Sequence, residues 1–351
     1  MDKIEIKGYK SFKNLTLDLR AINILIGSNG SGKSNFLSFF EFLNRIYEHK
    51  LTEYVALSGG VDKFFFQGSK ITDTIRASIK FQNDSYSFEL KEGDGKFVFS
   101  KEGIRYQNNY YEIGHFNNEA CIKSYNDLEE GNYIKSYLSE IKKYHFHDTG
   151  KSSPFTKESN VVNDVYYLYE KGENIAAFLY EIHKDMPIVY NRIIRTIQSV
   201  APYFSDFYFN VSSSNTVRLQ WTDKYSSTIY GPMDLSDGTI RFIALTTLFL
   251  QPKLPKVIII DEPELGLHPF AIQKLSGMIK SAAAKNTQVI IATQSADLIS
   301  NFDAEDVITV NQVGGCSVMK RLNQENLDAW LDEYTLGDLW KQDIIKGGQP
   351  V

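Results

Sequence analysis

The stretch Gly27-Ser28-Asn29-Gly30-Ser31-Gly32-Lys33-Ser34 matches the pattern G-x-x-x-x-G-K-[ST] and decides the fold of this chain. It follows the apolar run Ile22–Ile26, which has the length of a buried strand. It also opens the segment Lys33–Lys50, in which aromatic residues recur at helical spacing. Glycines allow the backbone to curl, so that its N–H groups and the helix start face phosphate oxygens. The pattern therefore predicts a strand, a phosphate-binding loop and a helix, in this order.

The side chains of this loop have the chemistry that a nucleoside triphosphate with Mg²⁺ requires. We expect Lys33 to reach the β- and γ-phosphates and Ser34 to hold the metal ion. The alternative is a glycine-rich strand-to-helix turn with a chance lysine, and the strand and helix on either side argue against it. The residues predicted to bind ATP are Ser28, Asn29, Gly30, Ser31, Gly32, Lys33, Ser34 and Asn35.

A second apolar strand, Val257–Ile260, ends in the carboxylates of Asp261 and Glu262. A strand that is buried on both faces delivers the residue after it to the carboxyl edge of a parallel sheet, where phosphates and Mg²⁺ bind. We expect Asp261 to belong to the Mg²⁺ shell and Glu262 to polarise the attacking water. Four apolar residues before Asp-Glu are a weak signal alone, but they gain weight after a phosphate-binding loop.

A third motif, Leu235-Ser236-Asp237-Gly238-Thr239, precedes a helix over Gly238–Leu250 that is apolar almost all round. Ser236 is a natural N-cap, and Gly238 permits a close backbone approach. An ordinary capped and buried helix would have the same features. The position of the motif between the loop and the Asp-Glu strand favours a functional role over that alternative.

The order of these motifs, followed by the strand and turn Ile290–Ser295, resembles that of the ABC-class ATPases. Gly8-Tyr9-Lys10-Ser11-Phe12 resembles the N-terminal strand of SMC proteins. Asp261–Pro269 resembles the Walker B motif and D-loop of RecF/OLD-like AAA ATPases. Tyr144–Asp148 and Tyr334–Trp340 resemble a group of stand-alone bacterial ATPases of this class. The resemblance spans nearly the whole chain.

The resemblance implies a site that two subunits share. ATP on the Walker A loop of one subunit would be completed by the signature residues of the other, which are Ser236, Asp237 and Gly238 here. The same arrangement would place His268, in the D-loop, at the interface of a homodimer.

Within one subunit, the resemblance implies that Glu262 and Gln294 are the catalytic residues. Gln294 stands where the class often has a histidine, and an amide orients water but does not titrate. Asp237 stands where the class has glycine, and it adds a negative charge near phosphate unless it faces away. Both departures predict slow or partner-stimulated hydrolysis. The residues implied to hold Mg²⁺ are Ser34, Asp261 and, as the candidate Q-loop glutamine, Gln67.

Composition places the chain among ordinary globular proteins, with 351 residues, 42% hydrophobic residues and a net charge of −5. This charge argues against a polybasic protein, although a local DNA-binding groove is compatible with it. Strands alternate with helices at both ends of the chain. The middle has another pattern, with short hairpin-like strands from Thr72 to Arg105. We therefore expect an α/β fold with an insertion. Together with the resemblance, this implies a P-loop NTPase with an ABC-type ATPase head (1–69 and 206–351), a mainly parallel core sheet, N-terminal antiparallel strands and an inserted α+β lobe (70–205).

Several features argue for a soluble, cytoplasmic protein without a membrane partner. Cys121 and Cys316 are too few for a disulfide framework, and residues 1–20 are too charged for a secretory signal. The longest apolar runs are shorter than a membrane span.

Two clusters in the middle of the chain have a functional and an ordinary interpretation. His145, His147 and Asp148 have the chemistry of metal ligands, but imidazoles that neighbours satisfy are commoner. Lysines interleaved with tyrosines suit a nucleic-acid backbone and equally a solvated face. These lysines are Lys135, Lys142, Lys143 and Lys151.

We therefore expect an ATPase that dimerises around two Mg-ATP and acts as a switch on DNA or on an effector protein, in DNA repair or phage defence. A nucleotide-gated scaffold with negligible turnover is one alternative. The nucleotide-binding subunit of a transporter is another, which the long gap between Walker A and signature disfavours.

OLD-type proteins carry a Toprim nuclease domain after the switch strand. Here the strand Val307–Val310 ends at Asn311 rather than Glu, and no Asp-x-Asp follows it. We expect the chain not to cut nucleic acid and any nuclease to be a separate polypeptide.

Overall fold

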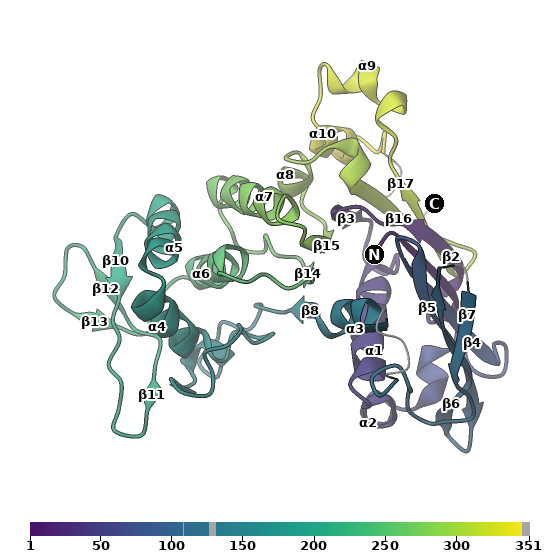
Figure 1. Cartoon of the computed structure of the whole chain (residues 1–351). Coiled ribbons are helices and arrows are strands. Elements are labelled where there is room, and N and C mark those ends of the chain that lie inside the picture. The colour runs from purple at the N-terminus through teal and green to yellow at the C-terminus, as the bar shows by residue number, and fades with distance from the viewer. Residues whose placement is uncertain (108, 126–130, 346–351) are drawn as a thin grey trace. The chain divides into compact units, whose positions relative to one another are not determined.

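The computed structural model describes residues 1–107, 109–125 and 131–345 (Figure 1). The chain divides into two compact units, which we call the first unit (Met1–Lys142 with Phe302–Val351) and the second unit (Lys143–Asn301). These bounds differ from the predicted division into 1–69 with 206–351 and 70–205, because the middle of the chain contributes to both units. The assignment of an ATPase head and an inserted lobe stays a prediction.

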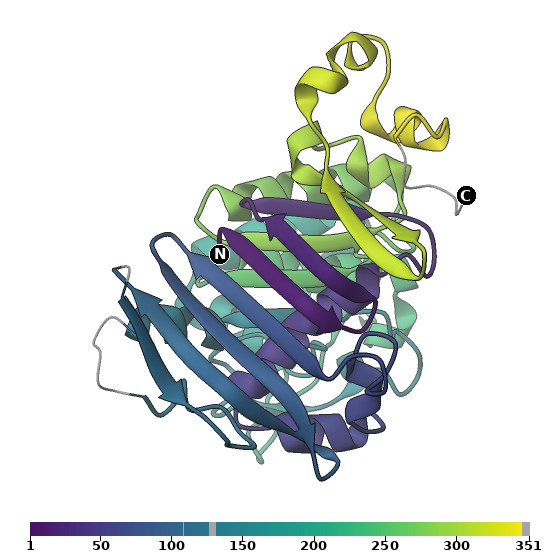
Figure 2. The same cartoon turned by 90° about the vertical axis from the view of Figure 1, so that its right-hand side faces the viewer.

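The first unit contains a six-stranded antiparallel sheet with the strand order β2-β1-β4-β5-β6-β7 (Figure 2). In the β1–β4 pair, Ile4 lies opposite Ile79 and Ile6 lies opposite Ala77, and all four side chains are buried. Alternate residues of a strand share a face, so this register buries one face of the sheet. The hairpins that the sequence suggests between Thr72 and Arg105 thus extend the N-terminal hairpin. The strands are β1 (Lys3–Tyr9), β2 (Phe12–Asp18), β4 (Thr74–Phe81), β5 (Asp84–Gly93), β6 (Lys96–Tyr106) and β7 (Asn109–Gly114).

Helix α1 (Lys33–Tyr47) lies against one face of this sheet (Figure 2) and contacts it through buried aromatic side chains, of which Phe39 belongs to the predicted stripe and Phe42 does not. The ring of Tyr9 on β1 lies 5.2 Å from that of Phe39, and the ring of Phe42 lies 6.0 Å from that of Phe97 on β6. Both pairs meet edge to face, an arrangement that adds about 0.5–1.5 kcal/mol to the burial of the rings. The other helices of this part are α2 (Leu51–Leu57), the 3₁₀ helix η1 (Val61–Phe64) and α3 (Gly131–Ser139).

Strand β3 (Ile22–Ile26), all of whose residues are buried, leads into the phosphate-binding loop. It pairs in parallel with β16 (Val307–Val313), which pairs antiparallel with β17 (Cys316–Arg321). Residues from the end of the chain therefore support a loop near its beginning. The short helices of this part are η4 (Ala304–Asp306), η5 (Gln324–Asn326), α9 (Asp328–Leu331) and α10 (Leu336–Lys341).

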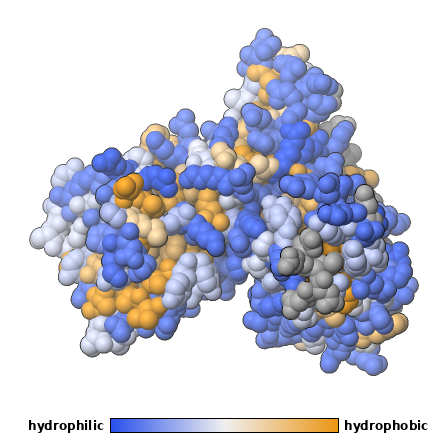
Figure 3. Space-filling model, in the orientation of Figure 1, coloured by the Kyte–Doolittle hydropathy of each residue, from blue (hydrophilic) through white to orange (hydrophobic). Residues whose placement is uncertain are grey.

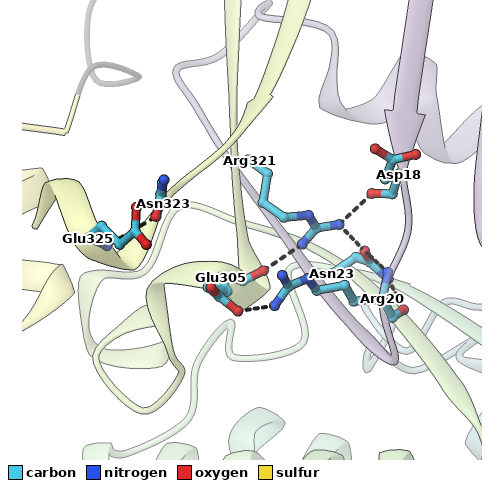
Figure 4. A network of polar contacts seen from close by, with 7 residues as sticks. All are labelled: Asp18, Arg20, Asn23, Glu305, Arg321, Asn323 and Glu325. Atoms are coloured by element: carbon cyan, nitrogen blue, oxygen red, sulfur yellow. Dashed lines mark hydrogen bonds and ion pairs between the residues drawn. The ribbon is translucent and has the colours of Figure 1, made fainter.

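Arg321, at the end of β17, forms hydrogen bonds that stabilise the turn preceding β3 (Figure 4). Its guanidinium donates to the carbonyl oxygens of Asp18 and Glu305, both at 2.8 Å, and to Oδ1 of the fully buried Asn23 at 2.6 Å. Burial lowers the pKa of Arg321 to about 10. Arg20 also pairs with the Glu305 carboxylate. Charge-assisted bonds to three acceptors hold the start of β3 in place.

The second unit is built around the parallel pair β14 (Val257–Asp261) and β15 (Gln288–Thr293). Helix α5 packs on α6, and α6 packs on α7. The helical stretch from Ile175 to Val200 is divided in two at Met186–Pro187, because proline disfavours the helical conformation of the residue before it. The helices are α4 (Ile175–Asp185), α5 (Pro187–Val200), α6 (Asp237–Leu250), α7 (Pro269–Ala283) and α8 (Ala296–Ile299).

Short strands complete the second unit. β10 (Phe204–Phe207), β12 (Trp221–Asp223) and β13 (Ile229–Tyr230) form a three-stranded antiparallel sheet, and β9 (Ser159–Asn160) pairs with β11 (Thr216–Val217). The remaining elements are β8 (Ile141–Tyr144), which spans the boundary between the units in the sequence, and the 3₁₀ helices η2 (Pro154–Thr156) and η3 (Pro232–Asp234).

Hydrophilic residues cover most of the visible face in Figure 3. Within the described ranges, none of the helices has both the length and the apolar character that crossing a bilayer demands.

Candidate functional site

The phosphate-binding loop joins β3 to α1 in the first unit, as the sequence predicts. Gly30 and Gly32 have φ angles of +80° and +113°, in the left-handed region that favours glycine. Gly32 is the N-cap residue of α1, and no side chain caps this helix start. An uncapped helix start favours anions, because its first N–H groups lack intrahelical acceptors.

Lys33 points back into its own loop. Its Nζ donates to the carbonyl oxygens of Gly27 at 2.6 Å and Ser28 at 3.0 Å, and the residue is 6% exposed. Asn29 and Ser34 are exposed. The loop thus combines a buried ammonium with an open hydroxyl at the helix start, which suits phosphate and a divalent cation.

A cluster of small polar residues supports the loop. Ser317 Oγ on β17 lies 2.6 Å from the carbonyl oxygen of Ser31 and 2.7 Å from Ser11 Oγ, and Asn35 Nδ2 donates to Ser11 Oγ at 2.9 Å. A Cβ on Gly32 would lie 2.0 Å from Ser317 Oγ, so glycine is required there. Sequence reasoning missed the support from Ser317, for which the sequence carries no signal. The Asn35 amide faces this cluster, and its assignment to ATP binding stays a prediction.

Gln67, the candidate Q-loop glutamine, also belongs to the first unit. It is exposed and has a φ of +55°, shortly after η1. A Cβ on Gly315, in the β16–β17 turn, would lie 3.5 Å from its Nε2. Its role at Mg²⁺ stays a prediction.

The Asp-Glu strand end lies in the second unit. Asp261 ends β14, and Glu262 follows with a φ of +41°, unusual for a residue other than glycine. Gln294 Nε2 donates to Glu262 Oε1 at 2.6 Å, and the Glu262 N–H donates to the Ala292 carbonyl at 2.8 Å. Backbone strain of this kind persists where surrounding contacts fix it, and it is common at functional sites.

Glu264, two residues further on, is buried, and sequence reasoning gave it no role. Its Oε1 accepts a hydrogen bond from Thr293 Oγ1, whereas its Oε2 has no partner among the described residues. Burial raises the pKa of this carboxyl above its ordinary value. The group therefore binds its proton more tightly in the folded chain than in water.

The signature loop has the predicted cap. Ser236 Oγ accepts from the Thr239 N–H at 3.2 Å, at the start of α6, and Ser236 and Asp237 are exposed. Asp237, whose charge the sequence leaves unexplained, accepts a 2.7 Å hydrogen bond from Thr149 Oγ1. The carboxylate thus has a partner within its own unit.

The D-loop lies directly against the signature. A Cβ on Gly238 would lie 2.3 Å from the Gly266 carbonyl oxygen, which excludes any larger residue without movement. Exposed His268 caps α7, since its Nδ1 accepts from the Phe270 N–H at 3.2 Å. The close approach that the sequence assigns to Gly238 is therefore made to the D-loop.

The histidine cluster does not form a metal site of the predicted kind, and the nucleic-acid role of the lysine cluster stays a prediction. His145 and His147 stack with ring centroids 4.5 Å apart, and the described residues hold no group of three His, Cys, Asp or Glu placed for a metal ion. Lys135 is buried and donates to the Tyr125 carbonyl oxygen, so it is not part of a solvated basic face.

The structure thus brings the predicted residues together in two sets. The first unit holds the P-loop and Gln67, and the second unit holds the Walker B end, the switch glutamine, the signature and the D-loop. A P-loop of this sequence and geometry, together with a Walker B strand end, a signature and a D-loop in the second unit, is typical of the P-loop ATPases of the SMC/OLD/ABC type.

The comparison with solved structures shows the corresponding fold. An SMC head, titled "Crystal structure of the SmcHead bound to the C-winged helix domain of ScpA", matches 93% of this chain and 99% of its own, with a TM-score of 0.60 and 17% identity. Residues 22–300 match the family described as "AAA domain, putative AbiEii toxin, Type IV TA system", and the chain belongs to this family.

Two relatives extend over most of the chain. The Old nuclease of Escherichia phage P2 is 22% identical over 93% of this chain, which spans only 61% of the length of that protein. An "ATP/GTP phosphatase" of Helicobacter pylori is 21% identical over 86% of this chain and 87% of its own length.

Proposed function

We propose that this chain binds ATP with Mg²⁺, forms a homodimer around two nucleotides and hydrolyses them, and so acts as a switch on DNA or on a separate effector protein. The hydrogen bond from Gln294 to Glu262, at the end of a buried strand, carries the proposal. A carboxylate held in this way is suited to orient a water molecule for attack on phosphorus. Similarity to the Old nuclease and to SMC heads favours DNA repair or phage defence as the setting.

The residues fit the ligands of this reaction. Buried Lys33 and the uncapped start of α1 suit phosphate oxygens. Ser34 and Gln67 of the first unit offer hydroxyl and amide oxygens, and Asp261 of the second unit offers a carboxylate. These are the hard ligands that Mg²⁺ prefers, and the ion would supply positive charge that neutralises the phosphates.

In the proposed hydrolysis, Glu262 orients the attacking water and accepts its proton. Gln294 fixes the carboxylate through its amide N–H and exchanges no proton itself. Because an amide cannot supply the positive charge of an imidazolium, we expect slow turnover that a partner stimulates. A measurable rate would separate this function from a scaffold with negligible turnover.

The proposed dimer uses the second unit's exposed loops. Ser236, Asp237 and His268 are exposed, and the Gly238–Gly266 contact holds the signature and D-loop together. Such a surface suits the P-loop nucleotide of a second copy, with the two-fold symmetry that most homodimers have. The SMC head that resembles this chain is bound to a domain of ScpA, which supports a separate partner protein here.

A charge asymmetry in the second unit favours nucleic acid as one partner. The segments 186–205, 238–260 and 265–296 contain no Asp or Glu, although the chain has 43. They include α5, α7 and all of α6 except its first residue, Asp237. A hollow of about 520 Å³ opens between α5 and α7, with exposed Arg192, Arg195 and Lys274 in its wall. A concave surface with cations and no carboxylates suits a phosphate backbone.

The decisive experiment measures the mass of the purified protein by size-exclusion chromatography with light scattering, with and without ATP. Glu262→Gln should form an ATP-dependent dimer, because it binds but does not hydrolyse. The same background with Ser236→Arg should stay monomeric although calorimetry shows ATP binding, and Lys33→Ala should lose both. Equal dimer fractions for Glu262→Gln and its Ser236→Arg derivative would exclude the signature from the interface.

A further inference from the structure

The segment His145–Thr149, which we call the strap, contacts two motifs of the second unit at once. His147 Nε2 lies 2.8 Å from the backbone carbonyl oxygen of Asp261, so the ring donates to the last residue of β14. Two residues later, Thr149 Oγ1 donates to Asp237 Oδ1 of the signature at 2.7 Å. Five consecutive residues therefore bridge the Walker B end and the signature loop.

Arg241, on the first turns of α6, ties the strap to the D-loop. Its Nη2 donates to the His147 carbonyl oxygen at 2.9 Å, and its Nη1 donates to the Leu265 carbonyl oxygen at 2.9 Å. Its Nε donates to the Phe146 carbonyl oxygen at 3.3 Å. A planar guanidinium with a fixed fork of donors holds carbonyls in one geometry better than a flexible ammonium does.

The strap gives a reason for the aspartate at position 237. A free carboxylate beside a bound triphosphate repels it, and the class pattern avoids this with glycine. Here the Thr149 hydroxyl holds the carboxylate and fixes its direction. Asp237 and Thr149 thus behave as a matched pair, in which the threonine is needed only because the aspartate is present.

We propose that Thr149, His147 and Arg241 are positioning residues that hold the signature loop in the pose that meets the nucleotide of the other subunit. The strap links the Walker B end, which serves one nucleotide, to the signature, which serves the other. The coupling is a property of the second unit alone, and its role at the nucleotide rests on the proposed function.

A double-mutant cycle tests the proposal in the Glu262→Gln background, with ATP-dependent dimer affinity as the readout. Thr149→Val should weaken the dimer about tenfold, because the released carboxylate faces the triphosphate. Adding Thr149→Val to Asp237→Gly should cause no further loss. Thr156→Val is the matched control, since its hydroxyl donates only to the Ser153 carbonyl in its own turn, at 2.8 Å, and it should leave the affinity unchanged.

Hydrogen exchange of the signature amides, measured without nucleotide, tests the positioning separately from the dimer. Thr149→Val should speed exchange in residues 236–241 severalfold, and Thr156→Val should not. The proposal would be overturned by unchanged exchange, or by a loss of dimer affinity from Thr149→Val that is equal with and without the Asp237→Gly substitution. If Glu262→Gln itself forms no dimer with ATP, the proposed function fails, and the exchange data still decide whether the strap positions the loop.

Discussion

The amide of Gln294 donates to the carboxylate of Glu262 over 2.6 Å and so joins the turn after β15 to the residue after β14. The switch position and the proposed catalytic carboxylate are therefore in direct contact within the second unit. The Gln294 amide, unlike the imidazole of a histidine, does not itself gain or lose a proton near neutral pH.

This contact predicts a specific loss in Gln294→Ala. The rate constant kcat for ATP hydrolysis should fall tenfold or more, about 1.4 kcal/mol of transition-state stabilisation, with ATP affinity unchanged. Gln294→His should instead add an inflection near pH 6.5 to the pH–rate profile, at about the ordinary pKa of imidazole. Steady-state kinetics over a pH series checks both. Native kcat in Gln294→Ala would remove the residue from the mechanism.

The approach of Gly238 to the Gly266 carbonyl predicts that Gly238→Ala is destabilising. The added Cβ would lie 2.3 Å from that oxygen, and the shift it forces should lower the free energy of unfolding by about 1–3 kcal/mol. Gly277→Ala, on α7, is the control, because its Cβ would meet no atom within 4 Å. That substitution should stabilise the chain by about 0.5–1 kcal/mol. Denaturant unfolding measures both, and equal effects would contradict the packing argument.

Buried Glu264 predicts a dependence of stability on pH. Burial raises its pKa in the folded chain, so unfolding releases a proton between the ordinary pKa of glutamate and the raised value. The stability of the native chain should therefore fall as pH rises through this window, relative to Glu264→Gln. The amide oxygen in that variant still accepts from Thr293. Urea unfolding at a series of pH values tests this, and parallel curves for the two proteins would refute it.

The hollow between α5 and α7, which is lined by cationic residues, predicts that charge reversal there weakens DNA binding. Arg195→Glu combined with Lys274→Glu should lower affinity for duplex DNA at least tenfold and reduce the slope of log K against log salt by about 2. Lys157→Glu combined with Lys224→Glu makes the same charge change at exposed residues outside this surface and should change both less. Fluorescence anisotropy with labelled DNA gives both quantities. If the variant keeps its affinity for DNA but no longer binds an acidic protein partner, the surface belongs to that partner.

The sequence by itself determined the local elements of the site. Strand β3, the glycine loop and α1 follow from apolar runs, glycines and an aromatic stripe within one short stretch. The Ser236 cap of α6 follows from the residue type and the apolar helix after it. Short-range sterics and hydrogen bonds decide such features, so neighbouring residues suffice to predict them. The order of the motifs also indicated the class of ATPase, which family membership and the SMC-head fold bear out.

Only the tertiary structure decided which distant residues support these elements. Ser317 contacts the P-loop from a strand almost 300 residues later in the chain, and β4 pairs with β1 across about 70 residues of sequence. Thr149 reaches Asp237, which turns an apparent departure from the class into one half of a pair. These contacts depend on how strands and loops pack at long range. The chain contains many serines and threonines in similar local sequence, and only the packing of the fold decides which of them contact the P-loop or the signature.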